Sequence, residues 1–213
     1  MTVTAVQVPL SSALREGTRH EHETAERSGF VEELLSGRLD RAAYADLAAQ
    51  QLAVYTALEA AGSRLTDDGD LVFHELTRVP AIEQDLAYLY GADWSARIRI
   101  LPATQVYVDR LAQAADSLPR YAAHAYTRYL GDLSGGQIIK RMLQRHYGFT
   151  SEGIAFYDFP EIHKLKPFKD VYRERLDALP LDAQARADVV AEACLAFRLN
   201  ADVFGELGAA HVR

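Results

Sequence analysis

The seven prolines of this chain fall at the boundaries of long segments in which apolar residues recur with the 3.6-residue period of an α-helix. Proline is tolerated in the first turn of a helix and disrupts a helix interior, so these prolines indicate where helices begin and end. Alternation typical of strands is scarce. We therefore predict an all-α fold, a single-domain helical bundle. The predicted helices span residues 11–28, 40–64, 81–90, 103–116, 119–147, 167–178 and 182–206, with Asp40 and Asp182 as N-caps.

The composition favours one globular domain. Apolar residues make up 49% and charged residues 25% of the 213 residues, close to the averages for globular proteins, which argues against disorder. No stretch resembles a linker, so we expect one domain over residues 1–213. Within it, residues 1–10 are expected to form a flexible N-terminal extension and residues 208–213 a C-terminal tail.

Charge and targeting patterns exclude several classes of protein. The formal net charge of −7 disfavours a nucleic-acid-binding surface, which is broadly basic. Cys194 is the single cysteine, so no internal disulfide is expected, and its apolar neighbours favour a buried hydrophobic role. The N-terminus lacks the basic and apolar regions of a signal peptide, and no run approaches the roughly 20 apolar residues of a membrane span. We expect a cytoplasmic protein without a membrane anchor.

The predicted first helix carries two histidines on different faces. His20 shares its face with charged residues and should point into water, whereas His22 lies on an apolar stripe. His22 is interpreted either as a core histidine satisfied by a hydrogen bond or as a ligand facing a cavity. Arg15 precedes it by one heptad, and Glu26 follows by one turn, where it can orient the imidazole. The stripe consists of Leu14, Thr18, His22, Ala25 and Gly29.

A glycine-rich stretch interrupts the segment that otherwise reads as one long helix over residues 119–147. Gly131, Gly135 and Gly136 fall within six residues, and each costs about 1 kcal/mol relative to alanine inside a helix. Either the helix breaks, with a loop at 134–136, or the backbone at Gly131 and Gly135 lies against a flat ligand. Neither the Walker pattern nor GxGxxG is present, so a phosphate-binding loop is not indicated.

A carboxylate sits among these glycines. Asp132 follows Arg128 by one helical turn, so the two side chains can pair. A buried carboxylate needs such a partner or ordered water. Asp132 is interpreted either as a structural, ion-paired acid or as an acid beside a ligand cavity.

Several segments resemble those of one known family in the same order along the chain. AYTRYLGDLSGGQ resembles the distal-helix signature of the heme oxygenases, and LREGT with HEHETAERSGF resembles their proximal helix. VYTALE, FYDF, FKDVYRERLDAL and AFRLN also resemble segments of the family. The resemblance spans nearly the whole chain, and its glycine-rich signature is highly specific.

The resemblance implies roles for individual residues. It makes His22 the axial ligand of the heme iron and Asp132 the carboxylate that organises distal water. By their helical spacing, Glu26 is predicted to orient His22 and Arg128 to support Asp132. Gly131 and Gly135 would touch the distal face of the heme. Where the family often has lysine, this chain has Arg15, which keeps the charge and can bind a carboxylate bidentately. The propionates would be contacted by Arg15, Tyr126, Lys169 and Arg173, and Phe197 and Asn200 would lie near the pocket.

The resemblance also implies a reaction. Heme b would be both cofactor and substrate, opened with O2 to biliverdin, carbon monoxide and ferrous iron, with attack at the alpha-meso carbon as the family default. The chain has no flavin or nicotinamide fingerprint, so electrons would come from an external reductase or ferredoxin. An acidic donor of this kind could be guided by the basic residues Lys140, Arg141, Arg145, Lys164, Lys166, Lys169, Arg173 and Arg175, most of which are also expected to form a solvated charged face.

Two other classes of protein are alternatives to a heme oxygenase. A non-catalytic heme carrier or sensor would share His22 and the basic residues but would not need Asp132 in a glycine-lined pocket. A different enzyme on a similar fold, such as a di-iron oxidase or a thiamine-salvage hydrolase, is less consistent. None of the seven histidines has the glutamate three residues before it that a di-iron site uses.

Overall fold

The computed structural model describes residues 8–65 and 71–212, and within these ranges it contains helices and no strand, which confirms the predicted all-α class. No helix in the described ranges combines the length and the apolar character needed to cross a membrane. The α-helices are α1 (Leu10–Gly17), α2 (Arg19–Glu26), α3 (Gly29–Leu35), α4 (Arg41–Arg64), α5 (Val79–Tyr90), α6 (Trp94–Arg97), α7 (Pro102–Ala114), α8 (Leu118–Ala125), α9 (Gly135–Tyr147), α10 (Leu165–Asp177) and α11 (Ala183–His211). Three further short helices are the 3-10 helices η1 (His74–Leu76) and η3 (Ala155–Tyr157) and the π-helix η2 (Tyr126–Leu130).

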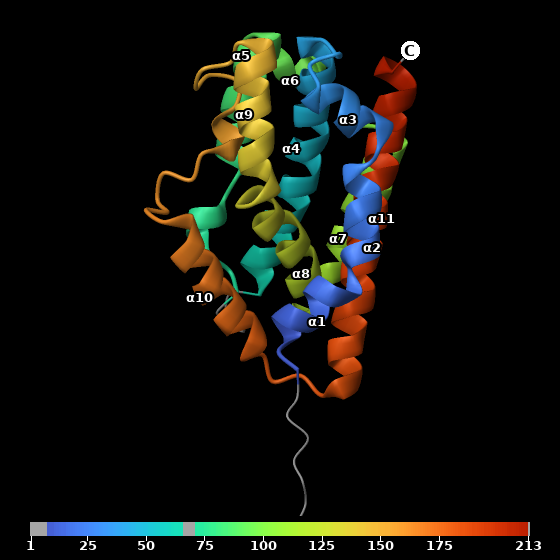
Figure 1. The fold of residues 1–213 in the computed structure, drawn as a ribbon, viewed down its shortest axis with the longest axis vertical. Helices are drawn as coiled ribbons and strands as arrows, with labels where there is room; N and C mark the ends of the chain where they lie inside the picture. Colours follow the sequence, from blue (N-terminus) through green and yellow to red (C-terminus); the bar gives the residue numbers. More distant parts are fainter. Residues whose placement is uncertain (1–7, 66–70, 213) are drawn as a thin grey trace, which may run out of the picture.

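Two long helices form the framework of the bundle. α4 packs against α5 and α7, and α11 packs against α7, α8 and each of the first three helices (Figure 1). α1 contacts α10, so the beginning of the described chain and a late helix meet at one end of the molecule. α2 and η2, which carry residues of the candidate site, both contact α11.

Local signals account for most helix starts. Asp40 accepts a hydrogen bond from the Ala43 amide at 2.9 Å, and Asp182 accepts one from the Ala185 amide at 2.8 Å, so both predicted N-caps are confirmed. Prolines occupy the first turns of α5, α7 and α8, where the missing N–H group leaves no intrahelical hydrogen bond unmade. The short helices α6, η1 and η3 were not predicted, because one turn shows no periodicity.

The prediction of one continuous helix over residues 11–28 is wrong. The segment is divided at Thr18 into α1 and α2, and α3 follows as a separate helix with Ser28 as its N-cap. The Thr18 hydroxyl donates to the Leu14 carbonyl at 2.8 Å, a local bond that competes with regular helix geometry. Beside it, a Cβ on Gly17 would lie 2.5 Å from Val190 Cγ1, so only glycine allows this close approach to α11.

The predicted helix over residues 119–147 is also interrupted. Its middle widens into η2, and a turn at positions 133 and 134 separates it from α9, with Ser134 at φ −123° and ψ −85°. A break therefore does occur, but Gly135 and Gly136 begin the next helix and do not form part of a loop at 134–136. Gly131 keeps a right-handed helical backbone.

The last helix is longer than predicted. α11 continues past residue 206 to His211, so most of the range 208–213 assigned to a C-terminal tail is helical. Tertiary contacts explain the extension: Leu207 is buried, and His211 Nε2 lies 2.8 Å from Asp46 Oδ2 on α4. At the other end, Leu10 is fully buried as the first residue of α1, whereas residues 1–7 of the predicted flexible extension lie outside the described residues. The single domain over residues 1–213 stays a prediction.

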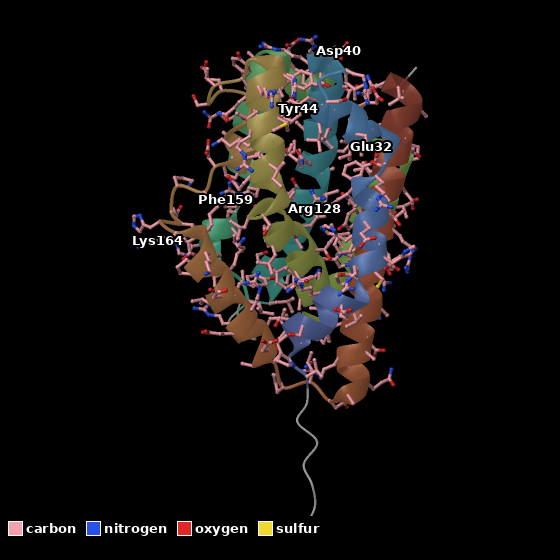
Figure 2. All side chains as sticks on the ribbon, viewed as in Figure 1. Glu32, Asp40, Tyr44, Arg128, Phe159 and Lys164 are labelled. Atoms are coloured by element: carbon pink, nitrogen blue, oxygen red, sulfur yellow. The ribbon has the colours of Figure 1, made fainter. Side chains whose placement is uncertain are left out.

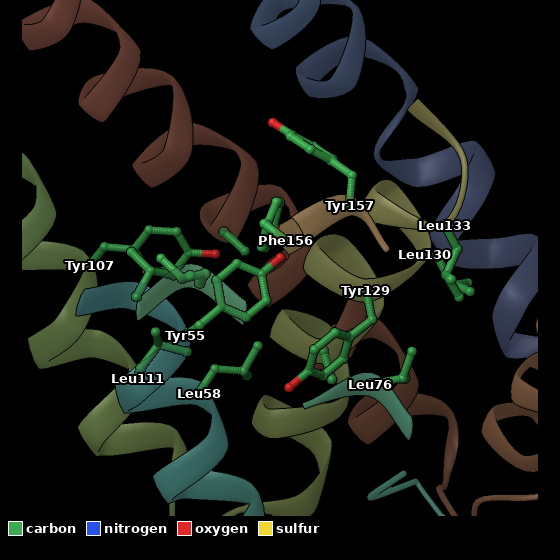
Figure 3. Close-up of a cluster of buried hydrophobic side chains, with 14 of the residues drawn as sticks. Tyr55, Leu58, Leu76, Tyr107, Leu111, Tyr129, Leu130, Leu133, Phe156 and Tyr157 are labelled. Atoms are coloured by element: carbon green, nitrogen blue, oxygen red, sulfur yellow. The ribbon is translucent and has the colours of Figure 1, made fainter. Parts of the chain in front are cut away.

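Aromatic side chains dominate the core where the site is built. Tyr55 on α4 and Tyr107 on α7 are fully buried, and Tyr129, Phe156 and Tyr157 are nearly so. Figure 3 shows the Tyr55 ring in the middle of this cluster, with Phe156 close to it. The Tyr55 and Phe156 rings meet edge to face at a centroid distance of 5.2 Å.

Candidate active site

His22 on α2 faces open space instead of the core. Its side chain is 51% exposed, which excludes the interpretation as a buried core histidine. Nδ1 lies 3.6 Å from Glu26 Oε2, so the carboxylate one turn away is placed to orient the ring directly or through water. The other side of the imidazole meets the Phe197 ring edge to face at 5.5 Å. His20 is exposed as predicted.

The glycines of the signature divide into two kinds. A Cβ built on Gly131 or Gly135 would meet no atom within 4 Å, so both glycines border open space. A Cβ on Gly136 would instead lie 3.3 Å from Tyr157 Cδ1, so this glycine is required for packing. Bare backbone that borders open space can accept a flat macrocycle in close contact. The residues on this side therefore fit the predicted ligand.

Asp132 lies directly between these glycines and is buried. Its Oδ2 accepts a hydrogen bond from the Tyr55 hydroxyl. Burial raises the pKa of Asp132 to about 6, although the charge of Arg128, the Tyr55 hydrogen bond and the charge of Arg78 act to lower it. A carboxyl group with such a pKa can both hold and release a proton near neutral pH.

Arg128 occupies the centre of the molecule (Figure 2). Its Nη1 donates to Asn200 Oδ1 at 2.6 Å, and its guanidinium carbon lies 4.9 Å from the centre of the Tyr55 ring. Burial lowers the pKa of Arg128, but Tyr55 and Asp132 raise it more, so the guanidinium stays charged. The predicted Arg128–Asp132 pair is therefore electrostatic, and Tyr55 contacts both partners.

One helix connects the two sides of the site. Phe197 and Asn200 lie three residues apart on α11 and therefore on the same face. Phe197 touches His22, whereas Asn200 holds Arg128. α11 thus sets the separation between the histidine and the glycine-bordered side.

A group of polar and cationic side chains lies at the end where α1 and α10 meet. Burial raises the pKa of Tyr126, whereas the nearby charges of Arg173 and Arg15 lower it, which places these three together. Lys169 Nζ donates to Ser134 Oγ at 3.0 Å, at the break before α9. Burial lowers the pKa of Lys169, and the nearby charge of Arg173 lowers it as well. The structure thus brings together the four residues predicted to bind propionates.

The other predicted basic residues do not join this group. Lys140 pairs with Asp158, and the Arg175 guanidinium lies 4.5 Å from the centre of the Phe73 ring. Lys164 projects from the periphery of the molecule, far from Arg128 in the view of Figure 2. These three basic residues thus lie apart from the cationic group.

Sequence reasoning missed two residues that contact the buried acid or act on it. Tyr55 lies within the VYTALE segment, and the sequence of its helix gives no signal that its hydroxyl reaches Asp132, 77 positions away. Arg78 is buried, follows the short helix η1 and acts on Asp132 by charge. No periodic pattern surrounds Arg78, and its burial alone distinguishes it from surface arginines.

Comparison with known proteins gives consistent matches over nearly the whole chain. The family model described as heme oxygenase matches residues 8–206. The chain is 41% identical to heme oxygenase 1 of Synechocystis over 206 residues, covering 95% of this chain and 86% of the relative. It is also 41% identical to heme oxygenase 1 of Rattus norvegicus over 207 residues, covering 94% of this chain and 72% of the relative.

Solved structures agree with these matches. The crystal structure of Synechocystis heme oxygenase-1 in complex with heme superposes with a TM-score of 0.91 at 40% identity, covering 95% of this chain and 94% of that one. The heme oxygenase of Leptospira interrogans superposes with a TM-score of 0.88 at 37% identity, covering 93% of this chain and 100% of that one.

Proposed function

The chain belongs to the heme oxygenase family, and from this premise we propose how its residues divide the work of heme degradation. The protein is a heme-degrading oxygenase, and heme is both its substrate and its bound cofactor. Bound heme supplies the redox-active iron and the ring that is opened. The assignments below concern what the side chains of this chain do around it.

His22 is the proposed ligand of the heme iron. Its exposed imidazole and the nearby Glu26 support this role, because a carboxylate that accepts a hydrogen bond from the Nδ1–H group leaves Nε2 with its lone pair for the metal. Phe197 limits the rotation of the ring by its edge contact. The propionate carboxylates are proposed to bind the cationic group at the meeting of α1 and α10, namely Arg15, Tyr126, Lys169 and Arg173.

On the opposite side, the backbone at Gly131 and Gly135 is proposed to lie against the heme face. Asp132 acts as the proton-holding group, since its pKa of about 6 lets it exchange protons with water near neutral pH. Arg128 stabilises the charged form of Asp132, and Asn200 holds Arg128 in place.

The proposed products are biliverdin, carbon monoxide and ferrous iron, with O2 as co-substrate. Electrons are proposed to come from an external reductase or ferredoxin, and Lys169 and Arg173 at the heme edge are suited to an acidic partner. Attack at the alpha-meso carbon and a cytoplasmic location stay predictions from the sequence.

The observation that carries these assignments is that His22 and Arg128 both contact α11, through Phe197 and Asn200, with open glycine backbone beside Asp132. The test replaces His22 by alanine and, as a matched control on the same helix, His20 by alanine. We expect the wild-type protein and His20→Ala to bind hemin one to one with the same absorption spectrum, and to yield biliverdin when reduced in air.

For His22→Ala we expect a changed iron spectrum and loss of biliverdin formation, because no second histidine is placed to replace the ligand. A His22→Ala protein with the wild-type spectrum would falsify the ligand assignment. Wild-type protein that binds hemin but yields no biliverdin on reduction would instead fit a carrier or sensor.

A further inference from the structure

A second buried carboxylate, Asp85 on α5, lies outside the site described above. It is 1% exposed, and its two oxygens accept hydrogen bonds from adjacent backbone amides, Ala155 N at 2.7 Å and Phe156 N at 2.8 Å. Burial raises the pKa of Asp85 to about 6, whereas the two amide hydrogen bonds lower it. Asp85 therefore anchors the start of η3 to α5 through two hydrogen bonds. Only a carboxylate offers two oxygens that can both accept from these amides.

The carbonyl side of the same segment is also held. The buried Arg78 donates to the Phe156 carbonyl at 3.1 Å and to the Asp158 carbonyl, and its guanidinium lies 4.1 Å from the centre of the Phe159 ring. η3 is thus held from two directions: the Asp85 carboxylate binds its amides, and the Arg78 guanidinium binds carbonyls in and after it. A short helix with so few bonds of its own needs such external partners to keep one position.

The position of η3 matters because its rings support the distal residues. The Phe156 ring meets the Tyr55 ring at a centroid distance of 5.2 Å (Figure 3), and the Tyr55 hydroxyl donates to Asp132. The neighbouring Tyr157 ring lies against Gly136, and the Gln137 side chain donates to the Tyr157 carbonyl at 3.0 Å. The packing therefore runs from Asp85 through η3 to the tyrosine that is bonded to the proposed proton-holding acid.

We propose that Asp85 is a positioning residue for the reaction: by holding η3 against Tyr55, it fixes the hydrogen bond from Tyr55 to Asp132. Asp85 touches neither the glycine-bordered space nor the cationic group, so it acts through Phe156. The inference rests on the proposed function, in which Asp132 holds the proton, and it adds a residue from a different helix to that function.

The test measures Asp85→Asn, which keeps the shape of the side chain but turns an amide N–H group toward one of the two backbone amides. The full-length protein is studied free and loaded with zinc protoporphyrin, a diamagnetic stand-in for heme. We expect the Ala155 and Phe156 amides to exchange with solvent about tenfold faster than in the wild type. We also expect the pKa of Asp132, followed by carbon-13 NMR of labelled aspartate, to rise above about 6, because the Tyr55 bond that lowers it weakens.

Asp46→Asn is the matched control. Asp46 also joins separate elements, since it accepts from the Tyr90 hydroxyl on α5 and pairs with His211 on α11, but it has no contact with η3. We expect neither the exchange of the η3 amides nor the pKa of Asp132 to change in this variant. An equal effect in both variants would mean general loosening and would overturn the proposal.

Phe156→Leu provides a second variant should Asp85→Asn fail to fold. It keeps both bonds to Asp85 but removes the ring that contacts Tyr55, so we expect the pKa of Asp132 to rise while the amides stay protected. An unchanged pKa in Phe156→Leu, or in a folded Asp85→Asn with fast amide exchange, contradicts the proposal. Asp132→Asn with normal biliverdin formation would instead remove the proposed role of Asp132 and leave the positioning result intact.

Discussion

A methyl group at Gly131 would meet no atom within 4 Å, whereas one at Gly136 would lie 3.3 Å from Tyr157. Both positions have helical neighbours, yet the reason for glycine differs. Gly136 is needed by the protein's own packing. Gly131 has φ −60° and ψ −50°, a backbone that alanine adopts more readily, so its glycine serves no purpose in the folded chain alone. The proposed contact with heme accounts for it.

Gly131→Ala is therefore expected to stabilise the heme-free protein and weaken heme binding. The free energy of unfolding should rise by about 0.5–1 kcal/mol, because alanine loses less backbone entropy. Urea unfolding and hemin titration measure the two effects. Gly136→Ala is the control, and we expect it to lower stability. A Gly131→Ala protein with unchanged hemin affinity would show that this backbone does not contact heme.

At the scale of elements, the cationic group depends on a junction between distant helices. Ser11 on α1 donates through its amide to Asp177 Oδ1 at 2.7 Å and through its hydroxyl to Oδ2 at 2.9 Å. This contact joins positions 166 residues apart and pins the start of α1 to the end of α10. Because Arg15 lies on α1 and Arg173 on α10, the junction brings the two charges near Tyr126.

Arg173→Ala is expected to weaken hemin binding about three- to tenfold, since it removes one partially exposed charge facing the proposed propionate site. The ratio of biliverdin isomers should also change if the heme is held less firmly. Arg175→Ala, on the same helix but directed toward Phe73, is the control and should leave hemin affinity unchanged. Titration and pigment chromatography report both quantities, and equal affinities for the two variants would argue against the assignment.

At the scale of the whole molecule, burial of acids shapes stability as well as chemistry. The folded pKa of Asp132 is about 6, above its ordinary value of 3.8, so the folded state binds a proton more tightly than the unfolded chain. The contribution of Asp132 to stability is therefore greatest at low pH and is lost as pH rises from about 4 to about 6. Burial raises the pKa of Glu192, but the hydrogen bonds and charges of His124 and Arg110 outweigh this and lower it to about 2. The stabilisation from Glu192 is therefore lost only as pH falls below the ordinary glutamate pKa of 4.5.

Between pH 4.5 and 6.5, the unfolding free energy of the heme-free protein should thus decline more steeply in the wild type than in Asp132→Asn. A single group with this shift accounts for up to about 3 kcal/mol over its full window. Urea unfolding at several pH values measures the slope. Asp109→Asn, which changes an exposed acid bonded to Gln105, is the control. Equal slopes in wild type and Asp132→Asn would refute the elevated pKa.

The sequence by itself determined the features that depend on near neighbours. Helical periodicity, proline positions and the caps at Asp40 and Asp182 specified the all-α class and most helix starts, because these signals act within a turn or two of chain. The resemblance of short motifs then located the histidine and glycine segments of the site.

Only the tertiary structure decided which distant residues meet. The close approach of α1 to Val190 requires glycine at position 17, and the reach of α11 to His211 follows from its contact with Asp46. The bonds of Tyr55 to Asp132 and of Asp85 to η3 join positions 70 or more residues apart. Such contacts arise from packing of the folded chain, so no local pattern in the sequence encodes them.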